Sequence, residues 1–271
     1  MTLIQLALLA IIQGLTEFLP VSSSAHLILV PWVTGEQDQG ALIDVMAHLG
    51  SLLAVMLYFR NDLMAMAGGG FDLMRGRKDN PASKLLIHII IATPFALVVG
   101  AVLFAFGWAE YLRDPLIIGI ATIFFGIVLW FSDRAVQNIN KMEDSKLSTA
   151  VWIGLAQVLA FIPGTSRSGI TMTAARFLGI SRKEAARFSM LLSIPLLGAM
   201  GAAALLDLAV SQPIAGAPGL VDGLVVAALS AVTAWVAIHL LMQLVQKIGF
   251  TPFVIYRIIM GLVILWFVLG H

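Results

Sequence analysis

Apolar residues dominate this chain in runs long enough to cross a lipid bilayer as helices. Six such runs carry almost no charge, and a run of roughly twenty residues spans the ~30 Å hydrocarbon core. They cover Ile43–Phe59, Leu85–Gly107, Leu116–Phe131, Ala185–Leu206, Gly219–Val245 and Pro252–Leu269. We therefore expect an all-α membrane protein with about six transmembrane helices.

Two further apolar segments, Thr2–Val30 and Ser148–Leu178, are interrupted in the middle by proline and small polar residues. The interruptions read "FLPVSSSAH" and "FIPGTSRSG". Non-helical backbone at membrane depth is tolerated only where protein buries it or where it lines a wet cavity. We interpret both segments as re-entrant helix–loop–helix hairpins, and two proline-kinked crossings are the alternative.

The two interrupted segments align with each other. With the prolines superposed, "QGLTEFLPVSSSAH" (Gln13–His26) lies over "AQVLAFIPGTSRSG" (Ala156–Gly169), and a long apolar span follows each. The chain is thus interpreted as one membrane domain, residues 1–271, built from repeats at 1–133 and 148–271. An inverted repeat of this kind places its site near the midplane, where broken helices meet. An unrelated origin of the two hairpins is the alternative.

Composition supports the membrane assignment and narrows the function classes. Hydrophobic residues make up 60% and charged residues 11% of the 271 residues, whereas a soluble domain carries roughly 25% charged residues. A net charge of +1 argues against nucleic acid as a partner. The absence of cysteine excludes disulfides, thiol catalysis and cysteine-ligated metals.

Basic residues gather in alternate connections between the spans, which assigns the sides of the membrane. Cytoplasmic loops are enriched in Lys and Arg, so these connections are expected to be cytoplasmic. They contain Arg60, Arg75, Arg77, Lys78, Lys84, Arg134, Lys141, Lys146, Arg182, Lys183 and Lys247, against Arg113 alone on the other side. The first hairpin then opens outward and the second inward.

Glu17 differs from the other acids because it lies inside an apolar helix, one turn before the first break. An ionisable group at membrane depth is costly and marks a functional site by default. Gln13 precedes it by four residues and so shares its helix face. His26 follows the turn, and the serines between them open a helix whose N-terminus favours an anion; they are Ser22, Ser23 and Ser24.

The second hairpin supplies fixed positive charge. Arg167 lies in "PGTSRSG", where small residues expose backbone N–H groups, and an arginine in such a setting is typical of a phosphate or carboxylate site. Its neighbours Thr165, Ser166 and Ser168 add hydroxyls, and Arg257 is a second arginine within an apolar span. A carboxylate, an imidazole, hydroxyls and two arginines at depth indicate an anion site with groups for acid–base chemistry.

Other polar residues in apolar surroundings receive structural interpretations. His48, His88 and His239 are expected to stabilise the fold rather than to act on a ligand. Arg176 and Arg187 lie near the cytoplasmic border and are expected to extend their charged ends to water.

Two functions suit these residues. An inverted repeat with broken helices is a common plan for secondary transporters, so a carrier or flippase for an anion is one reading. A membrane hydrolase is the other, favoured by a hydroxyl and an imidazole beside a carboxylate, which anion transport does not require. The buried charges argue against a purely structural protein.

The two motifs together resemble the bacterial undecaprenyl-pyrophosphate phosphatase family, which is associated with bacitracin resistance. "QGLTEFLPVSSSAH" is similar to the family's Glu/Gln-x-x-x-Glu and Pro-Val-Ser-Ser segments, and "PGTSRSG" to its arginine motif. "FSMLLSIP" (Phe188–Pro195) and "PFVIYRI" (Pro252–Ile258) also resemble family segments, so the likeness covers essentially the whole chain.

The resemblance implies an enzyme of the bacterial inner membrane whose site faces the periplasm. It would hydrolyse undecaprenyl pyrophosphate to undecaprenyl phosphate, the carrier lipid of peptidoglycan synthesis. It also implies a divalent cation, Mg²⁺ or Ca²⁺, and allows a homodimer. Gln13 stands where many members have glutamate, so a cation bound there would meet one charge fewer.

Carried onto this sequence, the motifs give each residue an expected role. Arg167 and Arg257 would hold phosphate oxygens, because phosphoryl transfer depends mainly on positioning and charge neutralisation. Glu17 and Gln13 would bind the cation. Ser23 or a water would be the nucleophile, with His26 as general base. The remaining substrate contacts are expected from Ser22, Ser24, Thr165, Ser166 and Ser168.

Overall fold

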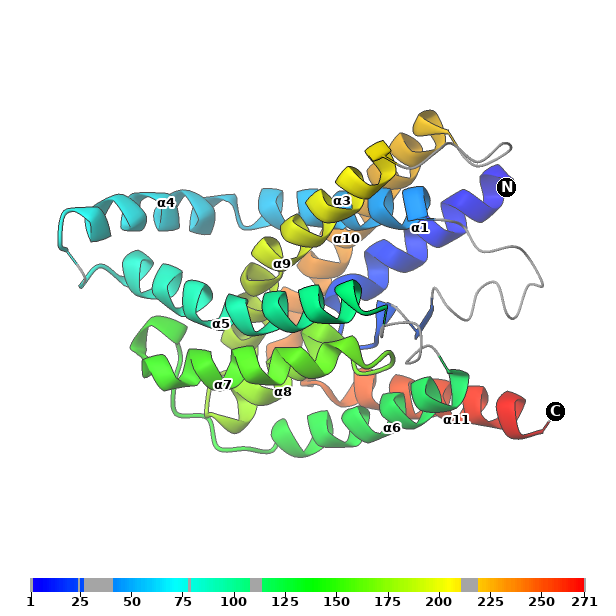
Figure 1. Ribbon diagram of the computed structural model, residues 1–271. Coiled ribbons are helices and arrows are strands. Elements are labelled where there is room, and N and C mark those ends of the chain that lie inside the picture. Colours follow the sequence, from blue (N-terminus) through cyan, green and yellow to red (C-terminus); the bar gives the residue numbers. More distant parts are fainter. Residues whose placement is uncertain are drawn as a thin grey trace.

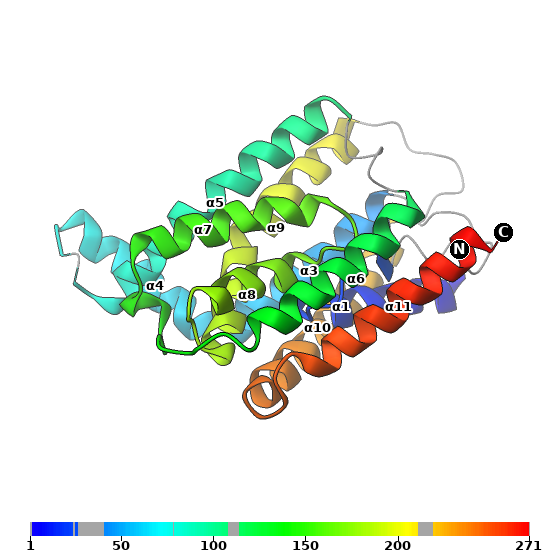
Figure 2. The same cartoon turned by 90° about the horizontal axis from the view of Figure 1, so that it is seen from below.

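The computed structural model describes residues 2–23, 25–26, 41–77, 79–107, 114–210 and 219–270, and it is built of helices (Figures 1 and 2). The first half of the chain contains α1 (Leu3–Phe18), α3 (Ala41–Tyr58), α4 (Arg60–Met74), α5 (Pro81–Ala105) and α6 (Pro115–Ser132). The second half contains α7 (Leu147–Val158), α8 (Arg167–Phe177), α9 (Arg182–Val210), α10 (Leu220–Ile248) and α11 (Thr251–Leu269). Short 3₁₀ turns, η2 (Met142–Asp144) and η3 (Leu159–Phe161), precede and follow α7.

Local sequence signals explain where several helices begin. The side chain of Asn80 accepts a hydrogen bond from Ala82 N, and Asp114 does the same for Leu116 N. In both places the next residue is proline, which suits the first helical position because its missing N–H would lack an intrahelical partner there. Caps of this kind start α5 and α6 at the membrane border.

Five helices are long and apolar enough to cross a membrane: α5, α6, α9 as far as Leu206, α10 and α11. They confirm five of the six expected crossings. The sixth, at Ile43–Phe59, corresponds to α3, and the chain turns by 76° between α3 and α4. The bent pair α3–α4 counts as a sixth span only if the two helices are taken together, or else as a re-entrant segment.

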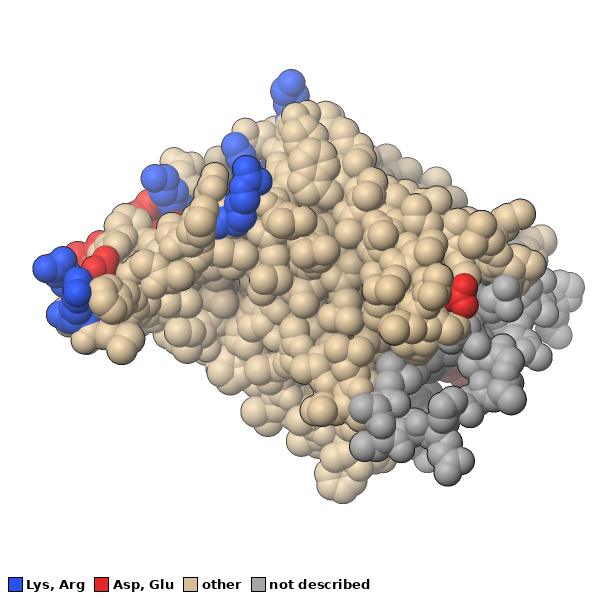
Figure 3. Space-filling model, turned by 90° about the horizontal axis from the view of Figure 1, so that it is seen from above, with Lys and Arg blue, Asp and Glu red and all other residues tan. Residues whose placement is uncertain are grey.

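The surface of these helices suits lipid. Large apolar side chains project from α11 into the surroundings, among them Ile255, Ile259 and Trp266, each more than half exposed. An apolar surface of this extent is typical of contact with a membrane or a partner rather than with water. In Figure 3 charged side chains gather near the end where α4 stops, and most of the remaining described surface on this face has none. The chain is therefore a multi-pass membrane protein.

The helix packing links the two halves. The first-hairpin helix α1 packs on α10 of the second half, and α7 packs on α5 of the first half. α3 packs on α9, and α6 lies beside α11, as both ribbon views show. These are the pairs that a two-fold repeat would give, and the repeat itself stays a prediction. The main core lies where the halves meet, around Phe18, Phe188 and Phe250.

Both predicted hairpins begin as expected. α1 is a 16-residue apolar helix that stops at Phe18, and the chain turns through Leu19–Ser22 before helical residues resume at Ser23. The remainder of that hairpin, to Val30, lies largely outside the described residues. The second is described completely, as α7, η3, a turn through Pro163 and α8.

Arg176 does not extend to water as expected, whereas the side chain of Arg187 is 21% exposed and ion-paired. Arg176 is 2% exposed and donates to the carbonyls of Asp133, Ala135 and Ile180. Arg187 pairs with three acids from different elements, Asp62, Glu143 and Glu184. The prediction was wrong for Arg176, because that side chain meets carbonyl acceptors in the loops after α6 and α8, which a single stretch of sequence does not reveal. They fasten the ends of helices together.

Candidate active site

A serine with positive φ marks each helix break. Ser22 has φ 77° and Ser166 has φ 70°, and they are the only non-glycine residues with positive φ in the described part of the chain. Each hydroxyl accepts a hydrogen bond from the backbone N–H three residues later, Ala25 and Gly169 respectively. Strained backbone of this kind clusters at functional sites. The two breaks therefore share one local geometry.

Gly164 allows the second break to lie against α6. Its φ is +93°, and a Cβ at this position would lie 2.5 Å from the carbonyl oxygen of Ile118. Both the backbone conformation and the close approach require glycine. The turn can therefore lie against α6, where the carbonyl of Gly164 accepts hydrogen bonds from Thr122 of α6 and Arg257 of α11.

Glu17 is at the centre of the site. Its Oε2 accepts hydrogen bonds from Gln13 Nε2 at 2.9 Å and from Ser23 Oγ at 3.0 Å. Its Oε1 lies 3.2 Å from Arg167 Nη2, so an ion pair joins the two hairpins. The carboxylate is 7% exposed, and a buried charge needs such partners. The structure thus brings together four of the residues that the sequence singled out.

Arg167 has hydrogen-bonding capacity left over. Its Nη1 donates to the carbonyl of Ser189 on α9, and Nη2 donates to Glu17. Its Nε is buried and has no hydrogen-bond partner among the described residues. The guanidinium is therefore held in place by α9 and the first hairpin while one N–H remains available.

A cavity of about 150 Å³ opens beside this ion pair. Its lining includes polar residues of both breaks and apolar residues of α9; the residues are Glu17, Ser22, Ser23, His48, Gln157, Ala160, Phe161, Ser166, Arg167, Leu196, Leu197 and Met200. A cavity of this size, with polar groups on part of its wall, can hold several waters or a phosphate group. Residues of both hairpins thus line one cavity, as the sequence predicted.

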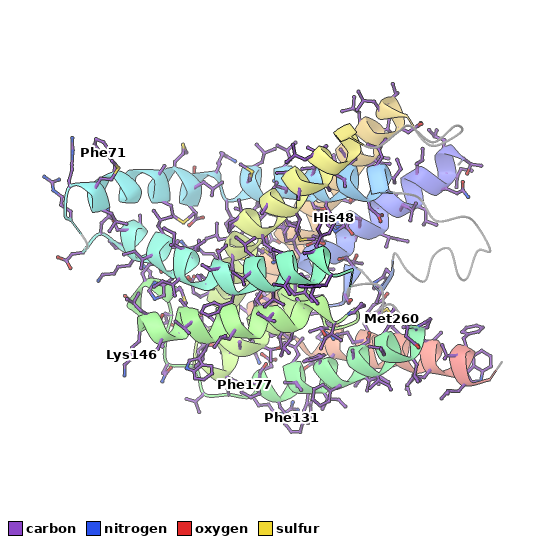
Figure 4. The ribbon with its side chains drawn as sticks, in the orientation of Figure 1. His48, Phe71, Phe131, Lys146, Phe177 and Met260 are labelled. Carbon is purple, nitrogen blue, oxygen red and sulfur yellow. The ribbon has the colours of Figure 1, made fainter. Side chains whose placement is uncertain are left out.

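His48 lies in this cavity, although the sequence suggested only a structural role. Its Nδ1 is 2.7 Å from the carbonyl oxygen of Asp44, and its Nε2 is 3.8 Å from Glu17 Oε2. Because a carbonyl only accepts, Nδ1 carries the hydrogen and Nε2 faces the carboxylate. Figure 4 shows His48 near the crossing of α3 and α9. A histidine in an apolar helix gave no signal that distinguished it from His88 or His239.

Arg257 lies outside the cavity lining and is fully buried. Its guanidinium donates to three backbone carbonyls, those of Thr122, Pro20 and Gly164. Two of these belong to the two breaks, one in each hairpin. Its predicted contact with phosphate stays a prediction, and in this structure the side chain ties the two breaks to α6 and α11.

His26 also lies away from the cavity lining. Its Nδ1 is 2.7 Å from the carbonyl oxygen of Ser22, and its Nε2 is 2.5 Å from the hydroxyl of Tyr256. The two rings are stacked, 5.6 Å apart. Ser23, its expected partner, instead donates to Glu17. Tyr256 was missed because it lies 230 residues from His26 along the chain.

The four remaining predicted contacts have different environments. Ser166 lines the cavity, whereas Ser168 donates to the carbonyl of Leu19 and so joins the second hairpin to the first break. Thr165 is fully buried, and its hydroxyl has no partner among the described residues. Ser24 lies outside the described residues.

Unpaired polar atoms gather around the two breaks. Seven buried side-chain polar atoms lack a hydrogen-bond partner within the described part of the chain. Five of these atoms belong to residues close to the breaks: one each to Gln13, Thr165 and Arg167, and two to Gln157. Because buried polar groups are nearly always paired, these atoms are available to hydrogen-bond a bound polar ligand or water. Gln157 is a further residue that the sequence analysis did not single out.

Comparison with known proteins shows the family to which the chain belongs. Residues 6–263 match the family described as "Bacitracin resistance protein BacA". The chain is 50% identical over 267 residues to the undecaprenyl-diphosphatase of Maricaulis maris, covering 98% of this chain and 99% of that protein. It is 45% identical to the enzyme of that name from Ruegeria pomeroyi, over 98% of each chain, and 47% identical to that from Hahella chejuensis, over 96% of each. The chain belongs to the bacitracin resistance protein BacA family.

Proposed function

We propose that this protein is an undecaprenyl-diphosphatase, which hydrolyses undecaprenyl pyrophosphate to undecaprenyl phosphate and inorganic phosphate. The observation that carries the proposal is the Glu17–Arg167 ion pair on the wall of a cavity lined by residues of both hairpins. Relatives that bear this name match the chain from end to end. The product is the carrier lipid of peptidoglycan synthesis, and its recycling explains bacitracin resistance.

Arg167 is the residue that binds phosphate oxygens. Its free Nε faces no protein acceptor among the described residues, and a guanidinium is well suited to phosphate. Ser166 adds a hydroxyl on the cavity wall. Phosphoryl transfer needs in-line positioning and charge neutralisation, which a rigidly held arginine supplies.

Ser23 is the nucleophile that the geometry supports best. Its hydroxyl already donates to Glu17, the relation expected of a nucleophile and its base. In the first step Ser23 Oγ attacks the terminal phosphorus, the bond to the bridging oxygen breaks, and Glu17 accepts the hydroxyl proton. Undecaprenyl phosphate leaves, and water then releases phosphate from the serine. The alternative, direct attack by water that Glu17 deprotonates, uses the same carboxylate.

His26 remains a candidate acid or base, although it does not line the cavity. Because its Nδ1 is tied to a carbonyl, the nitrogen available for proton exchange is Nε2, now paired with Tyr256. A role in protonating the leaving group requires a change of that pairing. The primary base in this proposal is therefore Glu17.

The donor set fits a divalent cation in part. Glu17 and the unpaired Oε1 of Gln13 are oxygen donors of the kind that Mg²⁺ and Ca²⁺ prefer. No group of three or more His, Asp or Glu side chains suited to a metal occurs in the described ranges. Phosphate oxygens and water would complete the shell, as is usual for Mg²⁺. When bound, the cation would supply charge neutralisation at the diphosphate.

The distribution of basic residues along the sequence suggests how the protein is oriented in the membrane. The predicted basic loops would face the cytoplasm of the inner membrane, with the site open to the periplasm. Undecaprenyl chains would lie against the exposed apolar helices. A homodimer stays a prediction from the family resemblance.

Phosphate release from undecaprenyl pyrophosphate by the purified protein tests the proposal. Cation-dependent release would support it. Binding of the lipid without release would favour the alternative, a transporter or flippase for a polyprenyl phosphate.

A further inference from the structure

Gln157 presents an unusual side chain to the cavity. It lies in α7 and is 0% exposed, and neither its Nε2 nor its Oε1 has a hydrogen-bond partner among the described residues. It lines the same cavity as Glu17 and Arg167. A buried amide with neither group satisfied is unfavourable, so an apolar side chain would stabilise this position better.

The position of Gln157 matches that of Gln13 in the other hairpin. Each glutamine stands nine residues before the positive-φ serine of its own break, Ser166 and Ser22. Superposing the prolines hides this relation, because the second break is one residue longer between proline and serine. Gln13 contacts Glu17, whereas Gln157 has Ala160 and Phe161 beside it on the cavity wall.

The chemistry of the amide suits a diphosphate. It offers two N–H donors and one carbonyl acceptor without adding charge. Phosphate oxygens accept hydrogen bonds, and Arg167 on the same cavity wall has an Nε–H with no partner among the described residues. We infer that Gln157 is a substrate-binding residue whose Nε2 donates to a phosphate oxygen of the diphosphate, on the α7 side of the cavity. This inference rests on the proposed function.

A Gln157→Leu variant tests the inference, with Gln243→Leu as the control. Gln243 is exposed on α10 and, among the described residues, its side chain hydrogen-bonds His239. We expect KM for undecaprenyl pyrophosphate to rise about 10-fold or more in Gln157→Leu while kcat changes less than about 3-fold, since a hydrogen bond to a charged group is lost. Its thermal midpoint should equal or exceed that of the wild type, because an unpaired amide has been removed. Gln157→Met, of similar length, replaces Leu if that variant misfolds.

A second readout separates this inference from the proposed function. Binding of inorganic pyrophosphate to the purified protein is measured by calorimetry, and Gln157→Leu should bind it about 10-fold more weakly than wild type. If wild type releases no phosphate, the proposed hydrolysis fails, yet weaker pyrophosphate binding by the variant still supports the inference. Unchanged KM and unchanged pyrophosphate binding in Gln157→Leu would overturn it, as would wild type that neither hydrolyses the lipid nor binds pyrophosphate.

Discussion

Glu17 and Arg167 lie 150 residues apart in the sequence, yet Arg167 Nη2 is 3.2 Å from Glu17 Oε1 in the structure. Glu17 precedes the first helix break and Arg167 follows the second, and the pair is almost completely buried. A carboxylate from one half and a guanidinium from the other therefore form a single charged unit inside an apolar protein. The arrangement explains why both interrupted segments are needed for one site.

The ion pair should show strong energetic coupling. Removing one partner leaves the other as a buried unpaired charge, which costs about 3–5 kcal/mol. Glu17→Gln and Arg167→Gln should each lower the thermal midpoint, and the double variant should be destabilised less than the sum of the two. Thermal unfolding of the three variants in detergent measures the coupling. Additive losses would contradict a direct pair.

Arg257 should affect stability before it affects substrate binding. Its guanidinium donates to three buried carbonyls, so Arg257→Met removes three buried hydrogen bonds and should cost about 3 kcal/mol or more. We expect a lower thermal midpoint together with reduced kcat, because both breaks lose their common support. A variant with normal unfolding but a raised KM would instead assign Arg257 to the phosphate, as the sequence first suggested.

Gly164 should tolerate no side chain. In Gly164→Ala the Cβ would meet the carbonyl of Ile118 in a backbone conformation that L-residues avoid, so we expect about 1–3 kcal/mol lower stability. Gly68 is the matched control, because it lies in α4 with nothing within 4 Å of a Cβ. Gly68→Ala should be neutral or stabilising. Equal thermal midpoints for the two variants would show that the second break is not held as described.

The sequence predicted the broken segments and the main site residues because they stand out against apolar surroundings. Glu17 and Arg167 are charges where charge is costly, and the prolines beside them indicate the breaks. The partners of Arg257 and His26 could not be predicted, because they are brought together only by helix packing. The bend between α3 and α4 was also missed, since the apolar pattern of Ile43–Phe59 alone resembles a full crossing.

His48 is another residue whose role depends on packing. His48 Nε2 lies 3.8 Å from Glu17 Oε2, so we expect His48→Ala to lower phosphate release about 10-fold. Stability should change little, since the His48 side chain is 30% exposed. His239→Ala is the control, because that ring stacks on Trp235 of α10, away from the cavity lining. Steady-state kinetics of the two variants compares them. Equal activities would return His48 to the structural role that the sequence suggested.

The most direct test of the account is phosphate release from undecaprenyl pyrophosphate by wild type and Glu17→Gln, each with Mg²⁺ or Ca²⁺ and each with a chelator. Glutamine keeps the size of the side chain but removes its charge and its capacity as a base. We expect cation-dependent release by wild type and about 100-fold or greater loss in Glu17→Gln. Release by the variant at the wild-type rate would contradict the central claim that the carboxylate joining the two hairpins is the base of the reaction.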